Sequence, residues 1–163
     1  MAKDLNGQIN AGQNGTKEDR QYGHSLQEAA MFLSQDFDKK VDLRTYSPLT
    51  LAYVGDAVYE IIVRTTLVKE GNCPVNQLHR KASALVKASA QAEAVRRIEP
   101  VLTEEEKNVY RRGRNAHSPT MAKHATMTDY RHATGFEALL GYLYLKGDVE
   151  RLLELCYTIP EKM

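Results

Sequence analysis

Little in this sequence points to a disulfide scaffold, a thiolate metal site or a membrane. The chain has only two cysteines, Cys73 and Cys156, and they lack metal-ligand spacing. No apolar run approaches the roughly 18 residues that a membrane span requires, and the N-terminus has no signal-peptide core. These absences favour a reducing compartment. We therefore expect a cytoplasmic protein with no membrane partner.

The length and composition suit one domain with a distinctly basic middle. A chain of 163 residues with 42% hydrophobic content can bury a real core. The net charge is only +1, yet residues 64–131 carry +6 and both flanking parts are mildly acidic. Such a block is either a solvated helix face or a surface for a polyanion, and charge alone leaves both readings open.

The apolar spacing predicts an all-α domain, because no stretch shows the alternation of a strand. Residues 1–23 are polar and predicted to be disordered, residues 24–46 form a short helical lead-in, and residues 47–160 form the domain. Ser47 is expected to cap a helix over 48–70 that begins with proline. A second long helix is expected from Pro74 to about Ile98.

Local capping signals predict the remaining helices. Thr103 and Glu106 form a capping box for a third helix that closes near Gly113. Residues 114–128 have no clear period and are read as a loop. A fourth helix is expected from about Asp129 to Lys146, stopped by Gly147, and a fifth helix capped by Asp148.

Two acids lie among glycines within predicted helices. Asp56 follows Gly55, and Glu137 lies between Gly135 and Gly141. Glycine within a helix costs roughly 1 kcal/mol relative to alanine, so these glycines indicate that something approaches the acids closely. A metal ion and a phosphate backbone are the first candidates. Periodicity by itself favours two ordinary acids on helix surfaces.

Two segments resemble the acidic motifs of the ribonuclease III family, in the same order and with a similar separation. The stretch from Arg112 to Ala116 and the end near residue 160 resemble its compact branch, Mini-ribonuclease III, which has no separate domain for binding double-stranded RNA. The resemblance covers roughly residues 47–158. The two motifs are Leu51-Ala52-Tyr53-Val54-Gly55-Asp56-Ala57-Val58-Tyr59-Glu60 and Ala133-Thr134-Gly135-Phe136-Glu137-Ala138-Leu139-Leu140-Gly141.

The resemblance implies a ribonuclease-III-like bundle of about five to seven helices and a metal-dependent endoribonuclease. Asp56 and Glu137 would be the catalytic residues and the ligands of Mg²⁺, with Mn²⁺ as a substitute. Ala52 and Thr134 stand where the wider family has two further carboxylates, which favours a single, weakly held ion. Thr134 and Glu60 are then expected around the metal rather than on it.

The resemblance also implies the partners, which are double-stranded RNA and a second copy of the chain. A precursor of large-subunit (23S) ribosomal RNA is the expected target. Tyr53 falls where the family places an aromatic that contacts the partner subunit, although a core role is equally open. For RNA binding the basic block offers Arg114, Asn115 and Lys123 first, then Arg111, Arg112 and Arg131.

Two functions of other classes compete with the enzyme. A non-catalytic ribonuclease-III-like factor that binds structured RNA in ribosome assembly would explain the missing carboxylates at Ala52 and Thr134. A helical protein-interaction module is the third hypothesis. The +6 block argues against the module, and the retained Asp56 and Glu137 argue against the pure binder.

Overall fold

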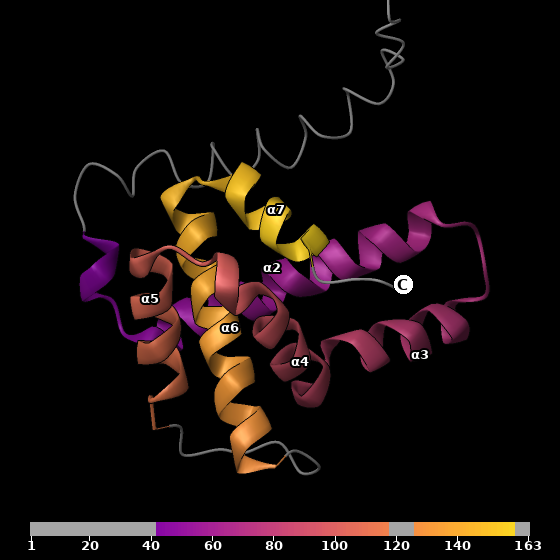
Figure 1. Cartoon of the computed structure of the whole chain (residues 1–163). Helices are drawn as coiled ribbons and strands as arrows, with labels where there is room; N and C mark the ends of the chain where they lie inside the picture. The colour runs from indigo at the N-terminus through magenta and orange to yellow at the C-terminus, as the bar shows by residue number, and fades with distance from the viewer. Residues whose placement is uncertain (1–41, 118–125, 159–163) are drawn as a thin grey trace, which may run out of the picture.

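The computed structural model describes residues 42–117 and 126–158, and every regular element in these ranges is a helix (Figure 1). This confirms the predicted all-α class. None of the described helices is long and apolar enough to cross a membrane. In chain order the elements are η1 (Leu43–Thr45), α2 (Pro48–Lys69), α3 (Val75–Val86), α4 (Ala88–Ile98), η2 (Glu99–Val101), α5 (Glu104–Arg114), α6 (Met127–Lys146) and α7 (Val149–Thr158).

Helix α6 lies at the centre of the bundle, with α2, α4 and α5 packed around it (Figure 1). From residue 133 to 145 nearly all of its side chains are buried, as expected for a helix that is apolar on every side. The Thr126 side chain caps its first turn by accepting a hydrogen bond from the Asp129 N–H. Gly147, with a φ of 78°, ends it in the left-handed region.

The expected single helix from Pro74 to Ile98 is wrong, because the chain breaks between α3 and α4. Lys87 is extended, with a ψ of 150°, although no proline or glycine lies nearby. The side-chain amide of Gln91 donates to the Val86 carbonyl at 2.9 Å and so caps the end of α3. A side-chain cap therefore accompanies this break, which helix propensity does not predict.

Two of the predicted helix caps, at Thr103 and Ser47, have different outcomes. The capping box is present, since Thr103 Oγ1 accepts from the Glu106 N–H at 3.2 Å and the Glu106 carboxylate accepts from the Thr103 N–H at 2.8 Å. Helix α2 begins after Ser47 with proline in its first turn, as predicted. The Ser47 side chain makes no capping hydrogen bond, however, so its predicted role as a cap is wrong.

Some predictions fall outside the described residues: the disordered extension over 1–23, most of the lead-in over 24–46, and Lys123. The last part of the lead-in is described and is held by α5. The Arg112 guanidinium donates to the carbonyls of Arg44 at 2.6 Å and Tyr46 at 2.7 Å. These two bonds fix the entry of the chain into α2.

Candidate active site

Helices α2 and α6 cross with their backbones in contact. A Cβ atom added to Gly55 would stand 1.8 Å from the carbonyl oxygen of Glu137. A Cβ added to Gly141 would stand 2.0 Å from the carbonyl oxygen of Leu51. No side chain fits at either position, so the two glycines allow an approach closer than ordinary helix packing.

This crossing corrects the expectation about what approaches the acids. The glycines were expected to leave room for a metal or a phosphate, but the neighbouring main chain occupies that room. Gly135 has a similar role on the other side of α6, where an added Cβ would lie 2.7 Å from the ring of Tyr110 on α5. The glycines therefore serve helix packing. That packing in turn brings Asp56 of α2 close to Glu137 of α6.

The two acids interact electrostatically with their surroundings and with each other. Burial and then the charge of Asp56 together raise the pKa of Glu137 to about 7. The Gln91 amide acts in the opposite direction by hydrogen bonding. Burial and then the charge of Glu60 raise the pKa of Asp56. Asp56 is exposed and Glu137 is half-buried, so the pair lies at the surface, and two carboxyl groups that repel each other there form a site that a cation would stabilise.

The residues present fit a hard divalent cation held by few protein ligands. Within residues 42–117 and 126–158, no group of three or more His, Cys, Asp or Glu side chains suits a metal. Asp56 and Glu137 would thus be the carboxylate ligands. Mg²⁺ commonly binds through one or two carboxylates and takes its other ligands from water and substrate phosphate. The buried amide oxygen of Gln91 lacks a hydrogen-bond partner among these residues, which adds a hard oxygen near Glu137.

Comparison with known proteins identifies the family of this chain. The family model described as the Ribonuclease III domain matches residues 49–148, which include both acids. The chain belongs to the ribonuclease III family. A Mini-ribonuclease 3 from Thermoanaerobacter sp. (strain X514) is 52% identical over 126 residues, covering 76% of this chain and 89% of that protein. A Mini-ribonuclease 3 from Clostridium tetani (strain Massachusetts / E88) is 51% identical over 125 residues, covering 76% and 82%.

A solved structure supports the same assignment. The X-ray crystal structure of protein FN1578 from Fusobacterium nucleatum superimposes with a TM-score of 0.69 at 29% identity, covering 76% of this chain and all of that one. By family the chain is an endoribonuclease, and its relatives place it in the Mini-ribonuclease 3 branch.

The positions where this ribonuclease III chain lacks carboxylates are buried. Ala52 and Thr134 are each 6% exposed. The Thr134 hydroxyl donates to the Tyr130 carbonyl at 3.0 Å, so its proton is used within α6. A role for Thr134 beside the metal stays a prediction. Glu60 forms an ion pair with Arg64 one turn along α2 and also acts electrostatically on Asp56.

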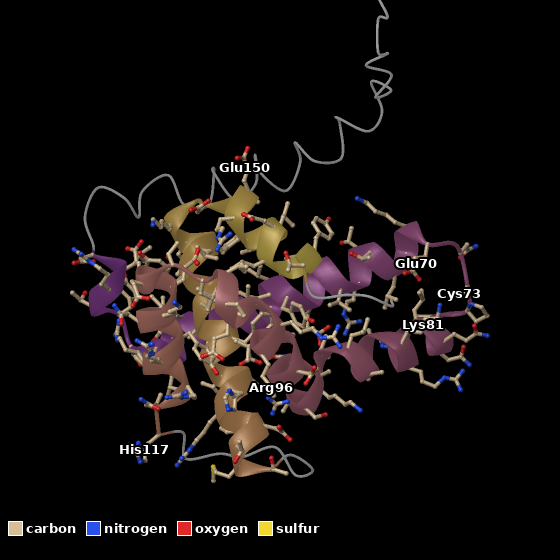
Figure 2. All side chains as sticks on the ribbon, viewed as in Figure 1. Glu70, Cys73, Lys81, Arg96, His117 and Glu150 are labelled. Carbon is tan, nitrogen blue, oxygen red and sulfur yellow. The ribbon has the colours of Figure 1, made fainter. Side chains whose placement is uncertain are left out.

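A basic cluster, defined as Arg96, Arg114 and His132, lies where α4 and α5 end against α6. Burial, and then the charges of Arg114 and Arg96, lower the pKa of His132. The Arg114 guanidinium lies 5.8 Å from the centre of the Tyr110 ring, and the Tyr110 hydroxyl is hydrogen-bonded to His132 Nδ1. Figure 2 shows Arg96 beside α6. Three helices thus bring these groups to one surface.

The other predicted RNA contacts have varied surroundings, and their binding role stays a prediction. Asn115 lies beside Arg114, whose Nε donates to Asn115 Oδ1 at 3.4 Å. Arg111 and Arg131 are exposed. Arg112 instead uses its guanidinium on the lead-in carbonyls, as described above.

Sequence reasoning missed two residues of this region, Arg96 and Gln91. Arg96 was passed over because it lies in the last turn of a helix with an acid three residues before it, an ordinary surface pattern. Gln91 carried a usable signal. It shares the inward register of α4 with Val95 and Ile98, at i, i+4 and i+7, where an uncharged polar side chain is unusual.

Proposed function

We propose that this chain is a Mg²⁺-dependent endoribonuclease that cleaves double-stranded RNA, with Mn²⁺ as a substitute metal. Asp56 and Glu137 are its proposed catalytic residues. The observation that carries the proposal is the backbone crossing at Gly55 and Gly141, which holds the two acids close together. A chain that only bound RNA would gain nothing from holding two mutually repelling carboxyl groups near a phosphate backbone.

Each part of the site has a separate task in this reaction. Asp56 and Glu137 would hold the cation at the site of cleavage. When bound, Mg²⁺ supplies positive charge that stabilises the transition state and makes an attacking water more acidic. The rigid helix crossing keeps both carboxylates in place before the substrate arrives, so little reorganisation is needed during the reaction.

The basic cluster is proposed to bind the RNA backbone. A-form RNA is recognised through its shape, phosphates and 2′-hydroxyls, which arginine side chains contact without reading bases. Arg114 lies next to Gly113, where an added Cβ would stand 2.8 Å from the Gly135 Cα. This end of α5 therefore lies against the stretch of α6 that leads to Glu137. Following the family resemblance, we propose a structured precursor of 23S ribosomal RNA as the target.

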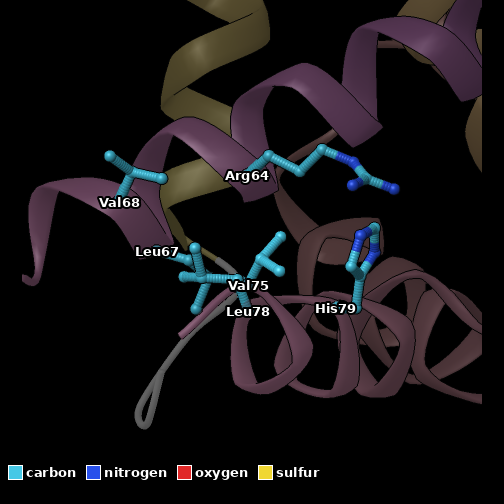
Figure 3. A pocket seen from close by; sticks show the side chains of 6 residues that line it. All are labelled: Arg64, Leu67, Val68, Val75, Leu78 and His79. Atoms are coloured by element: carbon cyan, nitrogen blue, oxygen red, sulfur yellow. The ribbon is translucent and has the colours of Figure 1, made fainter. Parts of the chain in front are cut away.

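Cleavage of both strands requires two sites, and we propose that a homodimer supplies them. One face of α2 exposes Tyr53 (82%), Ile61 (52%) and Val68 (59%), which follow each other at helical spacing. Beside Val68 a cavity of about 210 Å³ opens between α2 and α3, with apolar walls and Arg64 and His79 on one side (Figure 3). An exposed apolar face of this kind is typical of a protein interface.

Light scattering tests the dimer directly. Tyr53→Ser is expected to shift the protein toward a monomer and to convert double-strand cuts into nicks. Val101→Ser removes an apolar side chain of similar exposure, 51%, from η2 and is expected to change neither property. If the Tyr53→Ser and Ile61→Ser proteins both stay dimeric, this face of α2 is not the dimer interface.

The catalytic proposal is tested with a long RNA duplex and a single-stranded RNA of the same sequence. Metal-dependent cutting of the duplex should disappear in Asp56→Asn and Glu137→Gln, while circular dichroism and duplex binding are retained. Glu150→Gln, an exposed acid on α7, serves as the acidic control and should retain activity. Tight duplex binding without cutting, with either metal, would instead favour the non-catalytic assembly factor.

A further inference from the structure

Gln91 links the break between two helices to the acidic site. It is 2% exposed, and its Nε2 donates to the Val86 carbonyl at 2.9 Å. That carbonyl belongs to the last residue of α3, just before the extended Lys87. The same amide acts on the Glu137 carboxyl group of α6 by hydrogen bonding. One side chain on α4 thus holds the α3 terminus and acts on a proposed metal ligand.

The hydrogen bond to Val86 fixes the orientation of this amide. Exchanging its oxygen and nitrogen would place two carbonyl oxygens against each other, so the N–H side must face Val86. The amide group has two N–H bonds, and the second is available for Glu137. The oxygen Oε1 is then the one buried side-chain acceptor in the described part of the chain without a hydrogen-bond partner.

A role in packing alone explains this arrangement poorly. A buried acceptor without a partner costs free energy, and the neighbouring inward positions of α4 are filled by apolar residues, Val95 and Ile98. An apolar side chain of the same volume would fill the space without leaving an acceptor unpaired. What it would not supply is an N–H donor directed at Glu137.

We propose that Gln91 is a positioning residue that orients the Glu137 carboxylate for cation binding. One N–H of its amide donates to the Glu137 carboxylate, and the other N–H donates to the Val86 carbonyl, which holds the amide in place. The inference rests on the proposed function, because it assumes that Glu137 is a metal ligand. Outer partners of this kind typically change metal affinity or activity by about 10–100-fold when they are removed.

The test measures Mn²⁺ binding to the RNA-free protein by electron paramagnetic resonance, and then cleavage of duplex RNA as a function of Mg²⁺. Gln91→Met keeps the side-chain volume and removes both N–H bonds. It should weaken Mn²⁺ binding about tenfold or more, raise the Mg²⁺ concentration for half-maximal cleavage by a similar factor, and leave the KM for RNA unchanged.

Val95→Ala is the matched control, since it is fully buried one turn along the same face of α4. This truncation should lower the melting temperature more than Gln91→Met does, yet leave Mn²⁺ affinity at the wild-type level. Equal Mn²⁺ affinity in Gln91→Met and wild type would overturn the positioning role, as would an equal loss of affinity in Val95→Ala.

The same titration separates this inference from the proposed function. Wild-type protein that binds Mn²⁺, with binding lost in Asp56→Asn and Glu137→Gln, confirms the metal site independently of Gln91. Failure of the wild type to bind Mn²⁺, or equal binding by all these variants, refutes the metal site and the role of Gln91 together. A normal site with an unaffected Gln91→Met protein refutes the role of Gln91 alone.

Discussion

Gly55 packs directly against the main chain of Glu137, so the residue next to one acid touches the backbone of the other. No side chain lies between them to absorb a change in helix spacing. The separation of Asp56 and Glu137 is therefore determined by contact between two backbones, which are far stiffer than a pair of long side chains. A substitution that moves α2 away from α6 changes the active site at the same time.

Gly55→Ala should both destabilise the protein and reduce cleavage. Alanine gains about 1 kcal/mol in helix propensity, but its Cβ would stand 1.8 Å from the Glu137 carbonyl oxygen. Overpacking against backbone should outweigh that gain and lower the free energy of unfolding by about 2 kcal/mol or more. Urea unfolding checks this, with the exposed Thr65→Ala on the same helix as a control expected near zero. A Gly55→Ala protein as stable as wild type would refute the tight crossing.

Glu137→Gln should stabilise the metal-free protein, and more so at high pH. Burial holds the pKa of Glu137 at about 7 in the folded state against an ordinary 4.5, so the folded state binds more protons between these values. Stability therefore falls as pH rises from about 4.5 to 7, and glutamine removes this cost. The gain should approach about 3 kcal/mol at pH 8 and be small at pH 4.

Thermal melts with EDTA at the two pH values measure this difference. Glu150→Gln, an exposed acid on α7, is the control and should show no such pH dependence (Figure 2). A gain for Glu137→Gln that is equal at both pH values would contradict the proposed burial of the carboxyl group.

The ion pair between Glu106 and Arg151 should have the opposite pH dependence. Burial alone would raise the pKa of Glu106, but hydrogen bonds from Arg151 and from the Thr103 N–H together lower it. A lowered pKa gives stability that is present at neutral pH and lost as pH falls below about 4.5. Glu106→Gln should cost about 2–3 kcal/mol at pH 7, measured by urea unfolding, because Arg151 loses its buried partner.

Glu104→Gln provides the comparison for this pair. Glu104 lies in the same helical turn and pairs with Lys107, but its side chain is 78% exposed. Its removal should leave the free energy of unfolding nearly unchanged, because water screens an exposed pair. Similar losses for Glu104→Gln and Glu106→Gln would show that burial does not distinguish the two pairs.

The basic cluster should contribute to RNA affinity in a salt-dependent way. In a Glu137→Gln background that does not cut, Arg96→Gln and Arg114→Gln should each weaken duplex binding and reduce the slope of log K against log salt by about 1. Fluorescence anisotropy at several salt concentrations gives the slope. Lys81→Gln, at the junction of α2 and α3 beside Glu70, should leave it unchanged. Equal slopes in all three variants would show that the basic cluster does not contact the RNA backbone.

Local signals explain what the sequence predicted correctly. The capping box at Thr103 and the terminator Gly147 act within a few residues of themselves, so the limits of α5 and α6 follow from short-range chemistry. The two acids were found through the glycines beside them. Their closeness follows from a contact between helices about 80 residues apart, which no local pattern reveals.

Long-range contacts explain most of what the sequence did not predict. The glycine contacts are made with backbone from another helix. Arg112 carried the charge of a candidate RNA contact, but its carbonyl partners lie 66 and 68 residues earlier in the chain. Each of these contacts depends on the assembled bundle.

The break at Lys87 also has a consequence for local unfolding. Because the break separates it from α4, helix α3 lies at the edge of the bundle and has only one buried residue, Ala82 (Figure 1). Helix α6, in contrast, is buried along most of its length. Amide hydrogens of α3 should therefore exchange with solvent much faster than those of α6, through opening events that leave the acid pair assembled. The cavity between α2 and α3 would then change volume during these openings. Glu137, by contrast, lies on α6, the helix whose amides should exchange most slowly.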